Sequence, residues 1–212
     1  MFDLIRAGGW LMWPILGCSV IAMAIVLERG WMLRRRRVVP PRLLHEVLEW
    51  IRTKPIDDAY LEHLHTHSPL GQLLATGLYN RHASRESMKQ SIEDAGRHVV
   101  ANLERFLNTL GTIAEVSPLI GLLGTTIGMI KTFNVISEQG VGNPALMSNG
   151  ISIALITTAS GLGIAIPALL FHRYFQSKVG DLVITIEQAA LRLVDAIHNG
   201  EGVREREPET HL

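Results

Sequence analysis

The chain has 212 residues, 47% of them hydrophobic, and its 20 Lys and Arg residues balance its 20 Asp and Glu residues. Long stretches of the sequence contain no charged residue, whereas the other stretches are densely charged. This pattern indicates membrane spans joined by charged segments. Zero net charge gives no electrostatic reason to expect a nucleic-acid partner. The single cysteine, Cys18, excludes an internal disulfide framework.

The first predicted element is a membrane span. Residues 7–27 carry no charge, and this run is long enough to cross the roughly 30 Å hydrocarbon core of a bilayer. Trp10 and Trp13 near its start and Trp31 after its end are typical interfacial anchors. The alternative is a cleaved signal peptide. Because Arg34–Arg37 follow the run in place of a small-residue cleavage site, a retained span is favoured.

The next segment, residues 34–108, is predicted to be helical. One helix is expected after Pro40-Pro41, Asp57-Asp58 can start another, and Pro69 breaks the chain again. No alternating strand pattern occurs.

An alternating triplet, His63, His65 and His67, raises the question of a metal centre. Such a site needs suitable geometry and a further ligand, for which Glu62 and Asp58 are the nearby candidates. A solvated loop or helix end is the favoured interpretation, so no metal and no cofactor are predicted.

The second span has an uncharged run at residues 116–130 and extends to Ile136 if the stem of Lys131 carries its ammonium to the interface. Glu115, at the other end, is interpreted as an interfacial charge. From Arg85 onward there is no proline before the span and apolar residues recur every three to four positions. The helix is therefore expected to begin well before the membrane.

The third span is the clearest, because residues 141–172 contain no Asp, Glu, Lys or Arg. Its helix is expected to begin after Pro144, with Ser148 or Asn149 as the cap. It is expected to reach about Phe171, and a charged helical continuation is predicted towards Ile197. The polar tail, residues 200–212, is predicted to be disordered.

The distribution of Lys and Arg predicts the orientation of all three spans. Basic residues follow spans one and three and precede span two, whereas residues 134–149 have none. By the positive-inside rule, the N-terminus is periplasmic and the 34–108 region and the C-terminus are cytoplasmic. The predicted fold is thus an all-α integral membrane protein with three spans and long helices extending into the cytoplasm. Its segments are the N-terminus and span one (1–33), the cytoplasmic helical region (34–108), span two (109–136), a periplasmic loop (137–147), span three (148–172), and the C-terminal helix and tail (173–212).

Spans two and three each carry a stripe of small residues at helical spacing. The stripes are Gly121, Thr125, Gly128 and Thr132 in span two, and Ala154, Thr158, Gly161, Ala165 and Ala168 in span three. Close helix packing is the favoured interpretation, because small residues let backbones approach. A hydrated path lined by the hydroxyl groups is the alternative, and the two are compatible.

Two further features bear on mechanism. Pro118 and Pro167 lie inside spans two and three, and each is expected to kink or loosen its helix. No titratable residue lies in the middle of a span, although a self-sufficient proton carrier normally needs one there. Because the chain also lacks a phosphate-binding loop and a nucleophile elbow, it is not expected to be an enzyme.

The span sequences resemble those of a known family. Pro118-Leu-Ile-Gly-Leu-Leu-Gly-Thr125-Thr-Ile-Gly128 is similar to the second-span signature of the ExbB/TolQ/MotA proton-channel family. The stretch from Ala154 to Ala168, which includes Pro167, is similar to its third-span signature. The opening Gly8-Gly-Trp-Leu-Met-Trp-Pro14 resembles ExbB-type members. Flagellar MotA proteins have four spans, so that branch does not fit.

This resemblance implies a motor subunit. ExbB-like proteins form homo-pentamers around a pair of single-span ExbD helices, and proton flow energises TonB for import across the outer membrane. TolQ-like proteins act with TolR and TolA, and a non-conducting membrane scaffold is a further alternative. The family's channel-facing threonines correspond to Thr125 and Thr158, and Gly121, Gly128 and Gly161 are expected to line the channel with them. Ile153 stands where members often have a glutamate, which leaves the proton route open.

Overall fold

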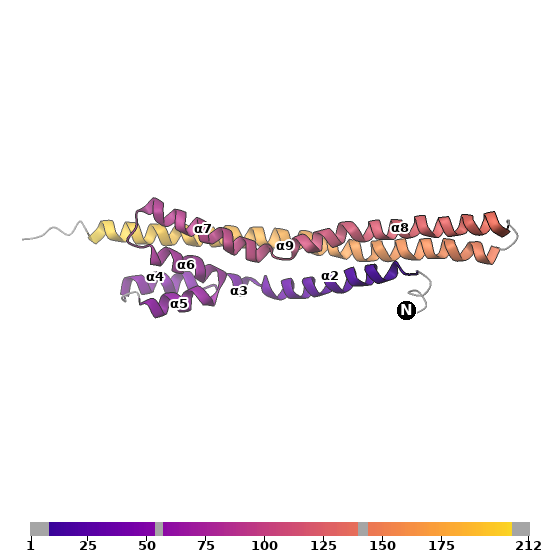
Figure 1. Cartoon of the computed structure of the whole chain (residues 1–212). Coiled ribbons are helices and arrows are strands. Elements are labelled where there is room, and N and C mark those ends of the chain that lie inside the picture. The colour runs from indigo at the N-terminus through magenta and orange to yellow at the C-terminus, as the bar shows by residue number, and fades with distance from the viewer. Residues whose placement is uncertain (1–8, 54–56, 140–143, 205–212) are drawn as a thin grey trace, which may run out of the picture. The chain divides into compact units, whose positions relative to one another are not determined.

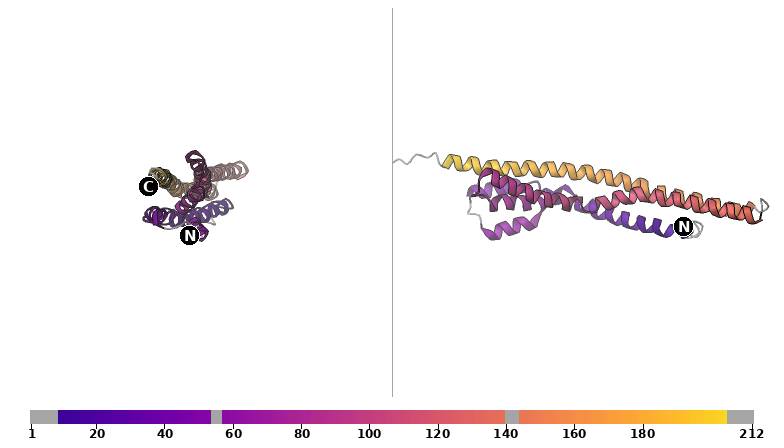
Figure 2. Two further views of the ribbon diagram at one scale, coloured as in Figure 1. Left: turned by 90° about the vertical axis from the view of Figure 1, so that its left-hand side faces the viewer. Right: turned by 45° about the horizontal axis from the view of Figure 1, so that its top comes forward.

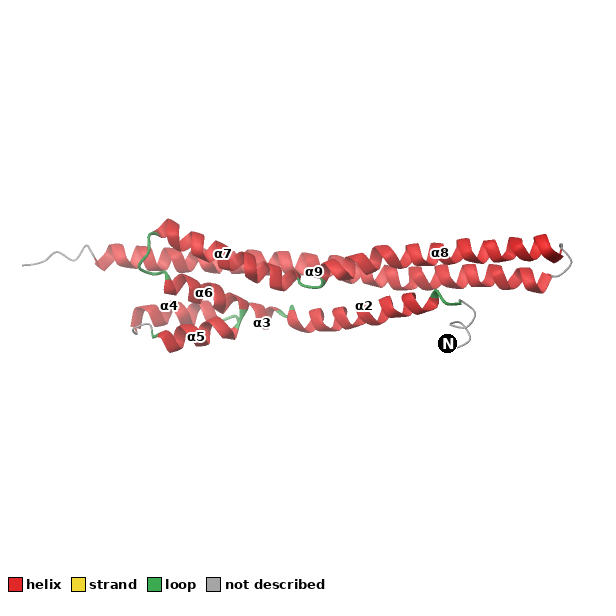
Figure 3. Cartoon of the chain, viewed as in Figure 1, coloured by secondary structure: helices red, strands yellow, loops and turns green. Residues whose placement is uncertain are grey.

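In a computed structural model of the chain, residues 9–53, 57–139 and 144–204 are described, and every regular element among them is a helix (Figure 3). The all-α prediction is therefore confirmed. The helices are α2 (Met12–Met32), α3 (Arg35–Val38), α4 (Leu43–Thr53), α5 (Asp58–His67), α6 (Pro69–Tyr79), α7 (Arg85–Glu104), α8 (Leu107–Gln139) and α9 (Pro144–Arg204).

Three helical stretches are long and apolar enough to cross a bilayer. They lie within Met12–Met32, Arg85–Ser137 and Ser148–His198, as the three uncharged runs predicted. Their exposed large apolar side chains are expected to be covered by lipid or by other protein chains. The side of the membrane that each end occupies stays a prediction.

The chain divides into two compact units. The first unit comprises residues 1–29 and 106–176, and it contains most of α2, all of α8 and the first part of α9. The second unit comprises residues 30–105 and 177–212, and it contains α3 to α7 and the rest of α9. Within the first unit, α8 and α9 run antiparallel and side by side (Figures 1 and 2).

In the first unit, α2 buries one stripe and exposes the rest. Ile15, Ala22 and Ile25 are buried at helical spacing, while Met23 and Leu27 are exposed. The guanidinium of Arg29, at the end of this stripe, is also buried, with 1% of the side chain accessible. It pairs with the Glu28 carboxylate at 3.0 Å.

The predicted helix from Arg85 into span two is interrupted, which corrects the expectation of one continuous helix. α7 ends at Glu104, α8 begins at Leu107, and Phe106 between them has a φ of 62°. Left-handed backbone is unfavourable for a bulky aromatic residue and costs on the order of 1–3 kcal/mol. The Arg29 guanidinium lies 5.4 Å from the Phe106 ring centroid, a cation–π contact that favours this conformation.

α9 is longer at both ends than expected. It begins at Pro144, so Ser148 and Asn149 lie inside the helix and neither caps it, contrary to the prediction. Proline suits a first helical position because its missing N–H would have no partner there. The charged continuation towards Ile197 is confirmed and reaches Arg204. Residues 200–204, predicted to be disordered, are thus helical, and residues 205–212 lie outside the described part.

In the second unit, two short helices begin where the sequence predicts a helix start or a break. Helix α5 is preceded by Asp57 at the cap position, as the Asp57-Asp58 pair predicted. Pro69 does end α5, but it also starts α6, where Ser68 Oγ accepts a hydrogen bond from the Gly71 N–H at 3.0 Å. This combination of a serine cap and proline in the first turn fixes a helix start.

The core of the second unit forms where α6 meets α7 and α9. Leu74 and Leu78 of α6 are fully buried, as is Leu193 of α9. A Cβ atom at Gly77 would lie 2.8 Å from Leu193 Cδ2 and 3.0 Å from Ile92 Cδ1, so the ends of these side chains pack directly against the glycine. The unit is therefore held by apolar packing around this close approach.

Candidate functional site

The candidate site is the seam along which α8 packs against α9 in the first unit. The backbones approach so closely that glycine is required at several positions. A Cβ at Gly161 would lie 2.5 Å from the Ser117 carbonyl oxygen, and one at Gly128 would lie 2.6 Å from the Gly150 carbonyl oxygen. Real Cβ contacts are never this short, so the close packing predicted from the small residues is present.

The buried members of the seam differ from the predicted stripes at one position in each helix. Most of the predicted small residues are buried, but Thr125 and Thr158 are only half-buried. Gly124 and Thr157 occupy the centre instead, and a Cβ at Gly124 would collide with the Thr157 hydroxyl. The buried residues are Gly121, Gly124, Gly128 and Thr132 on α8, and Ala154, Thr157, Gly161, Ala165 and Ala168 on α9.

Helical spacing explains why the sequence did not single out Gly124 and Thr157. Residues three and four positions apart both fall on one face, so steps of 4-3-4 and 3-4-4 from Gly121 fit equally well. The first choice selects Thr125 and the second selects Gly124. Only the facing helix decides, because the Thr157 side chain needs the space that Gly124 leaves.

The half-buried threonines lie at the edge of the seam, and their hydroxyl protons are already used. Thr158 Oγ1 donates to the Gly121 carbonyl oxygen across the seam at 3.1 Å. Thr125 Oγ1 donates to the Leu122 carbonyl oxygen of its own helix at 2.7 Å. A hydroxyl has one donor and two acceptor lone pairs. Each threonine therefore keeps acceptor capacity but no spare proton.

Thr125 and Thr158 lie on the same side of the seam. Successive residues of an α-helix are offset by about 100° around its axis, so residues four apart lie side by side. Thr125 therefore lies next to Met129, and Thr158 lies next to Leu162. Both neighbours are large, apolar and exposed. When two antiparallel helices pack face to face, the edge of α8 that carries Thr125 and the edge of α9 that carries Thr158 lie on the same side of the pair. The two hydroxyls are thus accessible from one common apolar face of the α8–α9 pair.

One imidazole lies at the end of the seam. The His172 ring packs against Gly111 of α8, where a Cβ would lie 3.0 Å from its Cε1 and 3.1 Å from its Nε2. His172 Nδ1 and, nearer the centre, the hydroxyl of Ser117 are buried without a hydrogen-bond partner among the described residues. Buried polar atoms of this kind are commonly satisfied by ordered water.

The residue at the family's glutamate place does not supply a charge. Ile153 is half-buried, and its carbonyl oxygen accepts from Thr157 Oγ1 at 2.9 Å. Glu115 and Lys131, which bound the uncharged run of α8, are both exposed. Within the described parts of the spans, no carboxylate lies between these ends.

The two prolines lie inside helices that continue through them. Pro118 is in α8 and Pro167 is in α9. Each lacks an N–H, so the carbonyl oxygen four residues earlier, at Ala114 and at Gly163, receives no bond from it. The kinks themselves stay a prediction.

The histidine triplet lies in α5 of the second unit and is not part of the seam. His63, His65 and His67 are all exposed, and the His63 and His67 rings stack with their centroids 5.6 Å apart. No group of three or more potential metal ligands converges among the described residues. The favoured interpretation, a solvated helix end, agrees with this placement.

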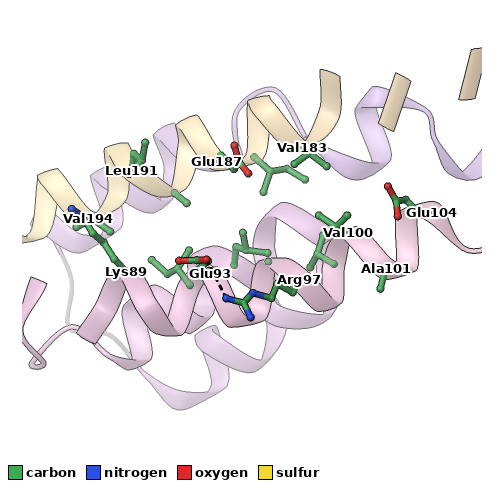
Figure 4. Close-up of a pocket in the computed structure, with 16 residues that line it drawn as sticks. Lys89, Glu93, Arg97, Val100, Ala101, Glu104, Val183, Glu187, Leu191 and Val194 are labelled. Atoms are coloured by element: carbon green, nitrogen blue, oxygen red, sulfur yellow. Dashed lines mark hydrogen bonds and ion pairs between the residues drawn. The ribbon is translucent and has the colours of Figure 1, made fainter. Parts of the chain in front are cut away.

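A cavity of about 680 Å³ lies between α7 and α9 in the second unit. Its walls are mainly apolar, with Val100 on α7 and Val183 and Leu191 on α9 (Figure 4). An ion pair between Glu93 and Arg97, at 3.2 Å, lies at its edge. None of the residues predicted for the site lines it.

Comparison with known proteins identifies close sequence relatives. Residues 65–188 match the MotA/TolQ/ExbB proton channel family. The putative biopolymer transport protein ExbB-like 1 of Synechocystis is 33% identical over 84% of this chain and 71% of its own length. ExbB-like 3 of Synechocystis is 32% identical over 81% of this chain and 82% of its own length. A putative biopolymer transport protein ExbB homolog of Methanothermobacter thermautotrophicus is 29% identical over 88% and 67%.

Proposed function

The chain belongs to the MotA/TolQ/ExbB proton channel family, and we propose that it is an ExbB-like subunit of a proton-driven motor in a bacterial inner membrane. The observation that carries the proposal is the α8–α9 seam. The two span signatures lie on facing helices, and the Thr158 hydroxyl of one donates to the Gly121 carbonyl of the other. The relatives named ExbB-like support this branch of the family.

The conducting unit requires a second chain, in this proposal an ExbD-like protein with a single span. A bare charge in hydrocarbon is costly, so proton passage needs water or titratable groups at depth. Neither the threonines nor Ile153 titrates. The partner span is therefore proposed to bring a carboxyl group to the face where Thr125 and Thr158 lie.

The hydrogen bonds of the threonines define which form of that carboxyl they favour. Both hydroxyl protons are donated to backbone carbonyls, so the free lone pairs can only accept. A protonated carboxyl can donate to them, whereas an ionised carboxylate cannot without breaking the existing bonds. The threonines are thus proposed to stabilise the loaded, neutral state of the partner's carboxyl on its way through the membrane.

The subunit is further proposed to assemble as a homo-pentamer and to energise a TonB-like protein. The close-packing glycines are used within the chain, so the assembly must use other surfaces. Large apolar side chains such as Leu155 and Phe133 remain exposed on the described part of the spans and can be covered by neighbouring copies.

A non-conducting membrane scaffold is the second candidate, and Ile153 is the observation that favours it. An isoleucine cannot replace the glutamate that family members often have at this place. A scaffold would assemble its partners as well as a motor does but would not depend on the seam hydroxyls.

The experiment compares the double variant Thr125→Val/Thr158→Val with Thr126→Val in cells that need a chelated iron source. Valine keeps the approximate volume and removes the hydroxyl. Thr126 is exposed and donates to its own helix, at 2.8 Å to the Leu123 carbonyl, so it is a matched control. We expect the double variant to lose growth and the control to keep it, while both still pull down the ExbD-like partner. Full growth of the double variant would favour the scaffold.

A further inference from the structure

Two histidines near the end of α5 form a pair on one side of this helix. His63 and His67 are four residues apart, and their ring centroids lie 5.6 Å from each other. Residues at i and i+4 are neighbours on a helix surface, so the backbone of α5 alone sets this spacing. The third member of the triplet, His65, is offset from His63 by about 200° around the helix axis and lies on another side.

The two rings are not used by the fold. Both side chains are exposed, and apart from their contact with each other the rings form no hydrogen bond or ion pair with a described residue. A neutral imidazole carries a lone pair on one ring nitrogen and can present either nitrogen. Two neighbouring lone pairs are thus available to a ligand that accepts electron pairs.

The spacing of the two rings fits one metal ion held by both. Nitrogen ligands lie about 2.0–2.1 Å from zinc, so two nitrogens on the same ion are roughly 3 Å apart. The torsion that orients a histidine ring has a broad range, so small rotations can bring one nitrogen of each ring to that separation. Pairs of histidines at i and i+4 on one helix face hold zinc in His-Glu-x-x-His sites by the same geometry.

The charge around the pair favours a positive ion. α5 ends at His67, and the last carbonyl groups of a helix give its end a partial negative charge. The sequence of α5 contains no lysine or arginine, whereas Asp58 and Glu62 are acidic. A cation bound between the two rings is therefore not opposed by a fixed positive charge of the same helix.

The ligand type selects the class of metal. Imidazole suits Cu²⁺, Ni²⁺ and Zn²⁺, whereas Mg²⁺ and Ca²⁺ prefer oxygen ligands. Because no group of three potential ligands converges among the described residues, the remaining coordination positions are open to water and the ion is exchangeable. Leu64, which is buried, follows His63 where the His-Glu-x-x-His motif has its catalytic glutamate. The pair is thus suited to binding a metal and not to hydrolysis.

We propose that His63 and His67 bind a divalent late transition-metal ion, such as Zn²⁺ or Cu²⁺, through one nitrogen of each ring. The ion links two successive turns of α5, directly before the Ser68 cap and Pro69 that begin α6. Its effect is to hold the last turn of α5 in helical form. The site shares no residue with the α8–α9 seam and does not depend on the function proposed for that seam.

The test uses the full chain, purified in a neutral detergent without a polyhistidine tag and titrated with Cu²⁺, Zn²⁺ or Mg²⁺ in a calorimeter. We expect Cu²⁺ to bind more tightly than Zn²⁺, and Mg²⁺ to give no response. His63→Gln and His67→Gln should each weaken Zn²⁺ binding by at least about tenfold, because the second ring no longer acts at a high effective concentration. His65→Gln, also at an exposed position of α5, is the matched control and should bind as the natural protein does.

Two further variants test whether the rings act together. The double variant His63→Gln/His67→Gln should lose little more affinity than either single variant, because one ring alone cannot chelate the ion. Thr66→His in the His67→Gln background places a ring three residues after His63 and should restore part of the affinity, a recovery that an unfolded His67→Gln chain would not show.

Three results would overturn the proposal. The first is an equal loss of Zn²⁺ binding in His65→Gln and in the two variants of the pair, which would indicate adventitious binding only. The second is a Mg²⁺ affinity equal to that for Zn²⁺. The third is a stoichiometry of one ion to two chains that is lost in His63→Gln, which would assign the rings to a site shared between copies.

Discussion

Thr158 Oγ1 donates a hydrogen bond to the carbonyl oxygen of Gly121, 3.1 Å away on the facing helix. The contact exists because Gly121 has no side chain: a Cβ there would lie 3.1 Å from Thr158 Cα. One residue from each family signature thus takes part in the contact that sets how α8 and α9 are aligned along their lengths. The same bond uses the hydroxyl's proton, which leaves Thr158 an acceptor towards the exposed face.

The first prediction concerns the energy of this bond. Replacing Thr158 by valine should lower the free energy of unfolding by only about 1 kcal/mol, the usual net value of one hydrogen bond. Thr158→Ser, which keeps the hydroxyl, should retain coupling. Thermal melts in detergent together with the iron-dependent growth assay check both. If Thr158→Val melts far lower than this, its growth defect would reflect unfolding rather than a lost acceptor.

The second prediction compares two glycines two residues apart on α9. Gly161→Ala should destabilise the chain by about 1–3 kcal/mol, because its Cβ would meet the rigid Ser117 carbonyl oxygen and force the helices apart. Gly163→Ala meets nothing within 4 Å and should be neutral or slightly stabilising, since alanine favours helix. The midpoints of thermal unfolding in one detergent measure the difference. Equal midpoints would contradict the close approach at Gly161.

The third prediction tests the contact between Gly111 and His172 by a double-mutant cycle. Gly111→Ala should cost about 1–2 kcal/mol, because the new Cβ crowds the imidazole ring, which can shift only in part. In a His172→Ala background the same substitution should cost much less, with a coupling on the order of 1 kcal/mol. If Gly111→Ala costs the same in both backgrounds, the ring is not what the glycine accommodates.

The fourth prediction concerns orientation. In a Cys18→Ser background, a cysteine in place of Asn143 should react with a membrane-impermeant reagent in intact spheroplasts, and one in place of Thr66 should not. The reason is that basic residues flank the Thr66 side of the spans and are missing from residues 134–149. Asn143 lies outside the described residues, so the labelling experiment is the direct measurement. Labelling at Thr66 alone would reverse the predicted topology.

The fifth prediction is a stability loss at alkaline pH that depends on Tyr60. Burial, and secondarily the negative charge of Glu46, raises the pKa of Tyr60 above its ordinary value of 10.0. Its ring stacks on Trp50 with centroids 4.2 Å apart. Below pH 10 the phenol is neutral in the folded and unfolded chain. Above pH 10 the unfolded chain ionises first, so stability falls as the pH rises towards the folded pKa.

Melting curves measured from pH 9 upward should show that the natural protein becomes less stable as the pH rises. In Tyr60→Phe this pH-dependent fall in stability should be absent. Tyr79→Phe, which removes an exposed phenol from the same unit, is the control and should retain the pH dependence. An identical pH dependence in Tyr60→Phe would show that another group titrates.

The sequence by itself determined the helical class, the three spans and the family. These depend on the length of uncharged runs, on helical periodicity and on motif identity, all of which are local properties of the chain. The charged continuation of α9 towards Ile197 followed in the same way, since no proline lies between Pro167 and Ile197, but the helical residues 200–204 were not predicted. The start of α9 could not be decided from the sequence, because Pro144 and Ser148 are both residue types that commonly begin a helix.

The tertiary structure decided the break before α8 and the choice of residues in the seam. Phe106 adopts a left-handed backbone that no local preference favours, and Arg29, far away in the sequence, lies against its ring. Gly124 was chosen over Thr125 because the Thr157 side chain fills the space it leaves. A helix periodicity of 3.6 residues allows either neighbour on a face, and only the shape of the facing helix removes that freedom.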